Sequence, residues 1–313
     1  MKEIFCIGEL LIDFVAENQG SDLSKANIFT KKPGGAPANV ACAISKLDGK
    51  STFIGCVGLD PFGNYLLNVL DENKVSVELA QRSATFTTLA FVSISEDGER
   101  DFIFSRGADR ELQYDSSIKT RFKDNMAHFG AATALLGGSL EDAYSHYLFD
   151  ALTQHSFISF DPNFREDLWK GNEEAFIKKS MPFIEKSHLC KFSLEEAQLL
   201  SGKKKIREAS EYFHETGVPL VVVTLGVEGT YVSAPNLKKT VPSIKVDPVD
   251  TTGAGDAFIG CLLRQISSLP EPQSIITETT ILKNMVEKAN EAGAITTTNF
   301  GAIPSLPTSS QIF

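Results

Sequence analysis

The stretch Pro33-Gly34-Gly35-Ala36-Pro37-Ala38-Asn39 is a glycine-rich turn that leads into apolar residues at helical spacing over 40–47. A short strand-like run at 4–7 precedes this turn. A second apolar run at 52–58 follows it, and an amphipathic segment over 61–73 comes next. The order strand, helix, strand, helix is typical of a sheet whose strands run parallel.

The same alternation returns in the second half of the chain. Short apolar runs at 134–138, 156–161, 188–192 and 220–224 are separated by helical stretches, and each ends in small or polar residues. Buried parallel strands have this pattern, and in open α/β sheets ligands collect beyond their carboxyl ends. We therefore expect an α/β domain over 1–313, with a mainly parallel sheet covered by helices.

One segment breaks this rhythm. Two β-rich runs at 89–94 and 101–104 flank Glu96-Asp97-Gly98-Glu99, and Asp-Gly between such runs predicts a hairpin. We expect residues of about 12–32 and 85–110 to form a small antiparallel layer that acts as a lid over one end of the sheet. Because an exposed sheet edge is commonly covered by a partner, a homodimer through this lid is a further expectation.

The composition excludes several classes of protein. The net charge of −10 disfavours nucleic acid as a partner. The five cysteines show no C-x-x-C spacing and lie mostly among apolar residues, as expected of a protein in the reducing cytoplasm. No apolar run is long enough to span a membrane, and the first residues read as a short strand rather than a signal peptide.

The segment Asp250-Thr251-Thr252-Gly253-Ala254-Gly255-Asp256-Ala257-Phe258 carries the clearest chemistry. Gly253 and Gly255 allow successive N–H groups to turn toward one point at a helix N-terminus, where an anion is favoured. Asp256 follows in the first turn. A capped helix after a glycine turn is the alternative interpretation, but an anion site beside a carboxylate is also what phosphoryl transfer to a hydroxyl requires.

The sequence resembles the ribokinase-like family of sugar kinases, whose fold is a three-layer α/β sandwich. The stretches 34–41 and 250–258 resemble its two signature regions, and 161–165 and 224–229 follow the family order. Within the family the chain is similar to fructokinases, for example over 8–15. The resemblance implies transfer of the γ-phosphate of ATP, with Mg²⁺ on the nucleotide, to the 6-hydroxyl of D-fructose.

The resemblance also implies roles for individual residues. Asp256 would be the catalytic base, and the anion hole would be formed by the backbone of Gly253, Ala254 and Gly255. The sugar would be bound by Asp13, Gly34, Gly35, Asn39, Arg106 and Arg165, the last of them also near phosphate. For Asp13, Gly35 and Asn39 the alternative interpretation is helix capping and turn formation.

The nucleotide would be bound by Lys191, Glu196, Thr224, Gly226 and Gly229. Ser193 stands where many family members carry Asn in an Asn-x-x-Glu motif that ends, here, at Glu196. A monovalent cation, potassium, would be held by residues from two segments: Asp250, Thr252, Thr296, Gly301 and Ser305.

The sequence leaves alternative functions open. The acceptor could instead be 2-keto-3-deoxygluconate, ribose or a nucleoside, because the phosphate machinery is shared within the family. A non-catalytic sensor of sugar or nucleotide is a second class. A dinucleotide oxidoreductase is disfavoured, because Gly34-Gly35 lies far beyond the first strand and no G-x-G-x-x-G occurs.

Overall fold

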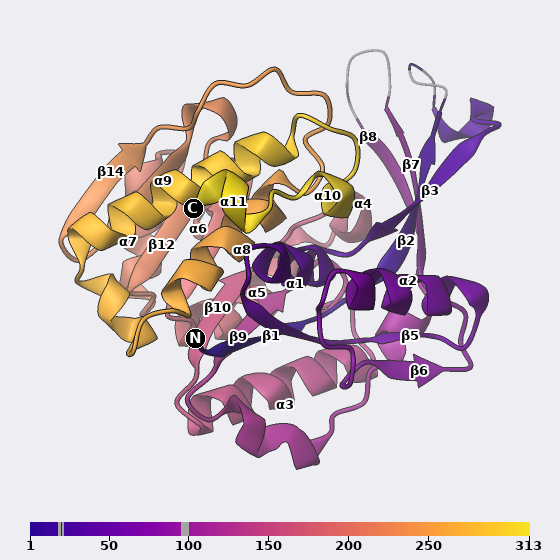
Figure 1. The fold of residues 1–313 in the computed structure, drawn as a ribbon, viewed down its shortest axis with the longest axis horizontal. Coiled ribbons are helices and arrows are strands. Elements are labelled where there is room, and N and C mark those ends of the chain that lie inside the picture. Colours follow the sequence, from indigo (N-terminus) through magenta and orange to yellow (C-terminus); the bar gives the residue numbers. More distant parts are fainter. Residues whose placement is uncertain (18–19, 21, 95–99) are drawn as a thin grey trace.

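An eight-stranded sheet forms the centre of the computed structural model, which describes residues 1–17, 20, 22–94 and 100–313 (Figure 1). In spatial order its strands are β14 Leu237–Val241, β13 Thr230–Ala234, β12 Leu220–Thr224, β11 Leu189–Ser193, β10 Phe157–Asp161, β9 Met126–Gly130, β1 Glu3–Ile7 and β4 Lys50–Ile54. The six strands from β12 to β4 are parallel, whereas β13 and β14 pair antiparallel at one edge. The expectation of a mainly parallel sheet is confirmed.

The sheet is buried on both faces because consecutive apolar side chains of its strands point to opposite faces. In β1, Ile4 and Cys6 belong to one hydrophobic cluster, and Phe5 and Ile7 belong to a second cluster on the opposite face. The first cluster is covered by the helices at 36–46, 61–72, 254–266 and 279–296, and the second by those at 139–153, 173–186, 194–201 and 206–215. The result is a three-layer α/β/α arrangement, as expected.

The helices begin and end as follows. The α-helices are α1 Ala36–Lys46, α2 Pro61–Glu72, α3 Ser139–Thr153, α4 Glu166–Trp169, α5 Glu173–Lys186, α6 Leu194–Ser201, α7 Ile206–Glu215, α8 Ala254–Ile266, α9 Thr279–Thr296, α10 Ala302–Ser305 and α11 Ser309–Ile312. The 3₁₀ helices are η1 Leu23–Lys25, η2 Ala108–Glu111, η3 Ser116–Phe122, η4 Gly226–Glu228 and η5 Pro272–Ile276. None of the helices in the described ranges combines the length and hydrophobicity that crossing a lipid bilayer requires.

A second sheet, called the small sheet below, rises beyond one edge of the large one (Figure 1). Its order is β3 Phe29–Gly34, β2 Leu11–Ala16, β7 Leu89–Ile94 and β8 Arg100–Ser105. β7 and β8 pair antiparallel, which confirms the predicted hairpin, while its Asp-Gly turn lies outside the described residues. β2 and β3 are also antiparallel, and the central pair β2 and β7 is parallel.

Two predicted strands differ from the structure. The run 134–138 is a turn of which only Ala134 and Leu135 are buried, and the strand of this unit is β9 instead. Gly137 and Gly138, with φ values of +94° and +82°, bend the chain into α3. The run 52–58 is divided at Gly55 between β4 and β5 Cys56–Gly58, which pairs with β6 Gln81–Ser83 in a two-stranded sheet. A Cβ at Gly55 would lie 2.4 Å from the carbonyl oxygen of Gly8, so only glycine permits this close approach.

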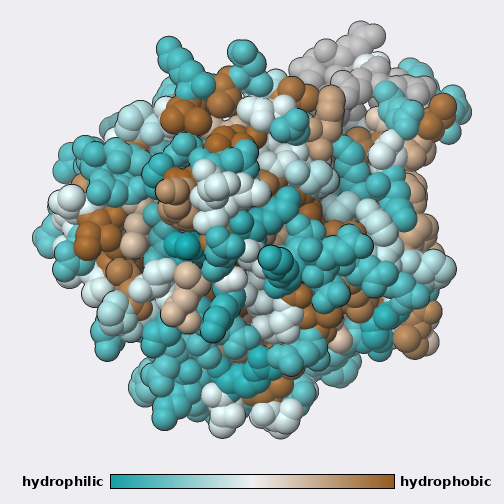
Figure 2. All heavy atoms as spheres, in the orientation of Figure 1, coloured by the Kyte–Doolittle hydropathy of each residue, from teal (hydrophilic) through white to brown (hydrophobic). Residues whose placement is uncertain are grey.

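The outer surface fits the acidic, mixed composition. Figure 2 shows that, on the face seen in Figure 1, hydrophobic residues are scattered among hydrophilic ones. The segments that contain the predicted site residues lie at the carboxyl ends of the parallel strands. The small sheet approaches these ends through β2 and β3.

Candidate active site

The N-termini of α1 and α8 meet at the carboxyl ends of the central strands, and each contributes a polar side chain to the junction. Asn39, in the first turn of α1, donates a hydrogen bond of 2.8 Å from Nδ2 to Oδ2 of Asp256, in the first turn of α8. Both side chains are buried. Burial raises the pKa of the Asp256 carboxyl, and the Asn39 hydrogen bond opposes that shift. The predicted base and a predicted sugar ligand are therefore in contact.

The glycine turn before α8 has the backbone conformation that an anion hole requires. Gly253 has a φ of +81°, and a Cβ there would lie 2.5 Å from Cβ of Ala302. At Gly255 a Cβ would lie 3.1 Å from Nζ of Lys191, so the lysine side chain approaches the first turn of α8 closely. The start of α8 thus presents backbone N–H groups beside a lysine side chain, as expected of a site for phosphate.

Lys191 forms a buried ion pair behind this helix start. It lies in β11, and its Nζ is 2.9 Å from Oδ2 of Asp161, the last residue of β10; the two side chains are 9% and 2% exposed. Burial favours the neutral amine, but the carboxylates of Asp161, Glu196 and Asp256 outweigh it and raise the pKa of Lys191. Lys191 therefore remains cationic beside the anion hole.

Asp161 was not among the predicted site residues, although the sequence carried a signal for it. It ends a buried strand and begins the Asp-Pro-Asn-Phe-Arg stretch of 161–165. His128, on the neighbouring strand β9, belongs to the same buried group: burial lowers its pKa to about 4, and its Nδ1 lies 3.2 Å from Oγ of Ser159. His128 is therefore neutral near pH 7.

The predicted sugar ligands Asp13, Gly34 and Gly35 lie where the small sheet joins α1. A Cβ at Gly34 would lie 2.1 Å from Oδ2 of Asp13, so the Asp13 carboxylate rests directly against this glycine. Gly35 has a φ of +108°, and its Cβ would lie 2.5 Å from the carbonyl oxygen of Glu9. The two glycines thus allow β2, β3 and the start of α1 to come together within a short distance of Asn39.

The two predicted arginines are placed differently. Arg106 donates from Nε to Oδ2 of the buried Asp109 at 3.1 Å, and Asp109 also accepts a hydrogen bond from Thr88. Arg165, just before α4, donates to the carbonyl oxygen of Phe164 at 3.2 Å. Burial raises the pKa of Asp256, and the positive charge of Arg165 opposes this rise, so Arg165 lies near the predicted base.

Glu196 has a structural function as the partner in a capping box at the start of α6. Its Oε2 accepts from the N–H of Ser193 at 2.7 Å, and Ser193 Oγ accepts from the N–H of Glu196 at 3.1 Å. Oε1 accepts from the N–H of Phe164 at 2.8 Å. Burial raises the pKa of Glu196, and the charge of Lys191 opposes this shift. Both carboxylate oxygens are therefore engaged by backbone donors.

The remaining predicted nucleotide ligands lie at the end of the adjacent strand. Thr224 ends β12, is in register with Ser193 of β11 and donates to the carbonyl oxygen of Phe192 at 3.3 Å. Gly226 and Gly229 have φ values of +56° and +99°. This loop continues the row of strand ends formed by Asp161 of β10 and Ser193 of β11.

The two segments predicted to hold a monovalent cation come together around Asp250. Its Oδ1 accepts from the N–H and Oγ1 of Thr252 at 2.9 and 2.6 Å, and its Oδ2 accepts from the N–H of Gly301 at 2.8 Å. The hydroxyl of Thr296 donates to the carbonyl oxygen of Ala292 within its own helix. Ser305 is buried, and its Oγ has no hydrogen-bond partner among the described residues.

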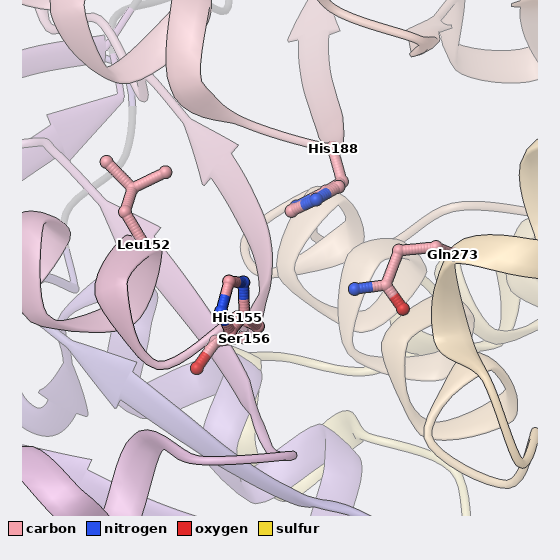
Figure 3. A pocket seen from close by; sticks show the side chains of 5 residues that line it. All are labelled: Leu152, His155, Ser156, His188 and Gln273. Atoms are coloured by element: carbon pink, nitrogen blue, oxygen red, sulfur yellow. The ribbon is translucent and has the colours of Figure 1, made fainter.

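A cavity of 260 Å³ lies near the amino ends of the central strands (Figure 3). Its lining residues are Leu152, His155, Ser156, His188 and Gln273. His155 and Ser156 precede β10 and His188 precedes β11, so the cavity adjoins the amino ends of these strands. It contains none of the predicted site residues.

Known proteins share the whole of this architecture. The model of the pfkB family carbohydrate kinases matches residues 1–309. "Probable fructokinase-2" of Arabidopsis thaliana is 39% identical over 97% of this chain and 93% of its own length, and "Fructokinase-1" of Zea mays is 38% identical over 99% and 96%. The crystal structure of a fructokinase from Vibrio cholerae O395 in the fructose, ADP and calcium ion bound form covers 100% of this chain and 98% of its own, with a TM-score of 0.85 and 31% identity. The chain belongs to the pfkB family of carbohydrate kinases.

Proposed function

We propose that this protein is an ATP-dependent fructokinase that transfers the γ-phosphate of ATP to the 6-hydroxyl of D-fructose. The reaction type is supported by one observation above all, the contact of Asn39 with a buried Asp256 beside the glycine turn of α8. The acceptor is supported by the fructokinases of plants and Vibrio cholerae that resemble the chain over nearly its full length.

In the proposed reaction Asp256 accepts the proton of the sugar hydroxyl. The hydroxyl oxygen then forms a bond to the γ-phosphorus while the bond between that phosphorus and the β,γ-bridging oxygen breaks, and ADP leaves. The raised pKa of Asp256 brings its basicity closer to neutral pH, and the Asn39 amide keeps the carboxylate oriented.

The chain's own groups offset the charge that develops on the transferred phosphoryl group. The N–H groups at the start of α8, from Gly253 to Gly255, would donate to the phosphoryl oxygens. Lys191 adds a positive charge at the same place, and Asp161 holds its ammonium group in position. Arg106 and Arg165 are proposed to contact sugar or phosphate oxygens from the opposite side.

The donor set fits a Mg²⁺ ion that arrives with the nucleotide. Mg²⁺ usually keeps several waters and binds through one or two carboxylates and the substrate phosphates. Both oxygens of Glu196 are engaged by backbone N–H groups, whereas Oδ1 of Asp161 has no hydrogen-bond partner among the described residues. Asp161 would therefore hold the ion, and the bound ion would supply charge neutralisation at the phosphates.

Potassium activation is proposed from the contact between the two segments at Asp250. A large, weakly hydrated cation suits carbonyl oxygens together with one carboxylate, and Asp250 joins Thr252 to Gly301. We expect a higher turnover in potassium chloride than in tetramethylammonium chloride at equal ionic strength. Equal turnover in the two salts would remove potassium from the proposal.

The small sheet is proposed to act as a lid over the site and to form the interface of a homodimer. The whole chain, including this sheet, is proposed to be a single kinase domain. We also propose a cytoplasmic location, supported by five free, buried cysteines at 6, 42, 56, 190 and 261. Sedimentation of the protein would test the dimer, because a monomer at working concentration would contradict it.

The function is tested by measuring ADP release from Mg-ATP with fructose, glucose, mannose, ribose, 2-keto-3-deoxygluconate and adenosine as acceptors. We expect the highest kcat/KM with fructose and loss of roughly 10²- to 10⁴-fold in kcat for Asp256→Asn, with ATP binding retained. Near-normal turnover of Asp256→Asn would remove Asp256 from the role of base.

The other outcomes separate the alternatives. A higher kcat/KM with another acceptor would keep the kinase and replace the sugar. Sugar and nucleotide binding without turnover on any acceptor would favour a sensor over an enzyme.

A further inference from the structure

Glu9 lies directly behind the first turn of α1 and has no part in the mechanism proposed above. Its side chain is fully buried, and its Oε1 accepts a hydrogen bond of 3.1 Å from the N–H of Ala36, the first residue of α1. Gly35, which precedes the helix, has no side chain that could cap it. Glu9 therefore supplies the cap from the segment that follows β1.

A cap alone does not require a carboxyl group at this position. The second oxygen of Glu9, Oε2, is buried and has no hydrogen-bond partner in the described part of the chain. Burying an ionisable group with an unsatisfied oxygen costs stability, and the carbonyl oxygen of a glutamine would accept the same N–H. A charge at this position therefore calls for an explanation besides capping.

The turn that Glu9 holds also carries the amide that orients the proposed base. The N–H of Asn39 donates to the carbonyl oxygen of Gly35 at 2.9 Å, and its side chain donates to Asp256. Oδ1 of Asn39 is buried and has no hydrogen-bond partner among the described residues. The direction of the Asn39 side chain thus depends on the backbone of this turn and on one hydrogen bond.

The groups around Glu9 place its protonation change near neutral pH. Burial raises the pKa of Glu9 to about 7; its own backbone N–H, the N–H of Ala36 and the charge of Arg165 oppose the rise, and the charge of Asp109 adds to it. Asp109 lies in η2 and Arg165 precedes α4. Tyr144 of α3 also faces Glu9, and its hydroxyl donates to the carbonyl oxygen of Gly130 at 2.7 Å.

We propose that Glu9 is a positioning residue for phosphoryl transfer, whose ionised carboxylate fixes the first turn of α1 and thereby holds Asn39 against Asp256. The inference rests on the proposed function. An ionised carboxylate is the stronger acceptor and interacts favourably with the positive end of the helix dipole. Protonation of Glu9 weakens the cap, so kcat falls as the pH decreases through neutrality.

The test compares wild type and Glu9→Gln with the acceptor that the wild type phosphorylates best, over about pH 5.5 to about pH 8.5. For the wild type we expect a step in kcat near pH 7. In Glu9→Gln this step is absent and only the acid limb that belongs to Asp256 remains, and kcat at the upper end of the range is lower by roughly 10- to 100-fold, with an unchanged KM for ATP. A Glu9→Gln profile with the wild-type midpoint and shape would overturn the inference.

Two further variants keep the result unambiguous. Asp150→Asn removes another buried carboxyl, which is bonded to Tyr114 and Lys119 outside the site, and it should lower stability without altering the pH profile. Glu9→Asp, the variant to use if Glu9→Gln does not fold, retains a charge but is too short to reach Ala36; wild-type kcat in Glu9→Asp would overturn the inference. A wild type that phosphorylates no acceptor would refute the proposed function together with this role, whereas an active wild type with an unchanged Glu9→Gln profile refutes the role alone.

Discussion

Replacing Lys191 by methionine isolates the contribution of the buried ion pair beside the anion hole. Methionine keeps most of the side-chain length and apolar volume, but it leaves the Asp161 carboxylate buried without its cation. In the wild type, Nζ of Lys191 lies 2.9 Å from Oδ2 of Asp161, and the two side chains are 9% and 2% exposed. Apart from this ion pair, neither oxygen of Asp161 has a hydrogen-bond partner among the described residues.

The expected cost follows from that burial. Removing one partner of a buried pair typically destabilises a protein by about 3–5 kcal/mol, because the remaining charge has lost both its partner and its water. The double variant Lys191→Met with Asp161→Asn removes the remaining charge as well. We expect it to recover roughly 1–3 kcal/mol relative to Lys191→Met alone.

Equilibrium urea unfolding at neutral pH, followed by circular dichroism, measures these differences. The matched control is Lys283→Met, which breaks an exposed pair whose atoms lie 2.8 Å apart but whose side chains are 38% and 43% exposed. This control should change the free energy of unfolding by less than about 1 kcal/mol. A cost below about 1 kcal/mol for Lys191→Met, or a double variant less stable than Lys191→Met, would refute the reasoning.

Two further predictions concern the contacts of the site. Asn39→Ala removes the hydrogen bond that opposes the rise in the pKa of Asp256. The acid limb of kcat should therefore move to higher pH, and kcat near neutrality should fall by roughly tenfold. Profiles of kcat against pH check this, and an acid limb that does not move would contradict it. Gly34→Ala places a methyl group where only 2.1 Å separates it from Oδ2 of Asp13, so the sugar KM should rise by about tenfold or more while the KM for ATP stays unchanged. Equal increases in the two KM values would show that Gly34 supports the fold rather than the sugar site.

Local sequence patterns were sufficient wherever a short stretch determines its own structure. Alternating and continuous apolar runs predicted the parallel strands β10, β11 and β12, and an Asp-Gly pair between two β-rich runs predicted the hairpin of β7 and β8. Apolar composition by itself was not enough at 134–138, which forms a turn because it ends in two glycines with positive φ, Gly137 and Gly138. Nor did the continuous run 52–58 reveal that its two halves pair in different sheets, since strand pairing is a non-local property.

The sequence by itself determined the fold class, the glycine turns and Asp256 as the candidate base, because these depend on residue spacing and backbone conformation within single segments. Only the tertiary structure decided that Asn39 contacts Asp256, that Asp161 pairs with Lys191 and that Glu9 caps α1. These contacts join segments far apart in the chain at the carboxyl ends of parallel strands. The direction in which each carboxyl group's pKa moves depends on burial and on neighbouring charges, which exist only once the chain is folded.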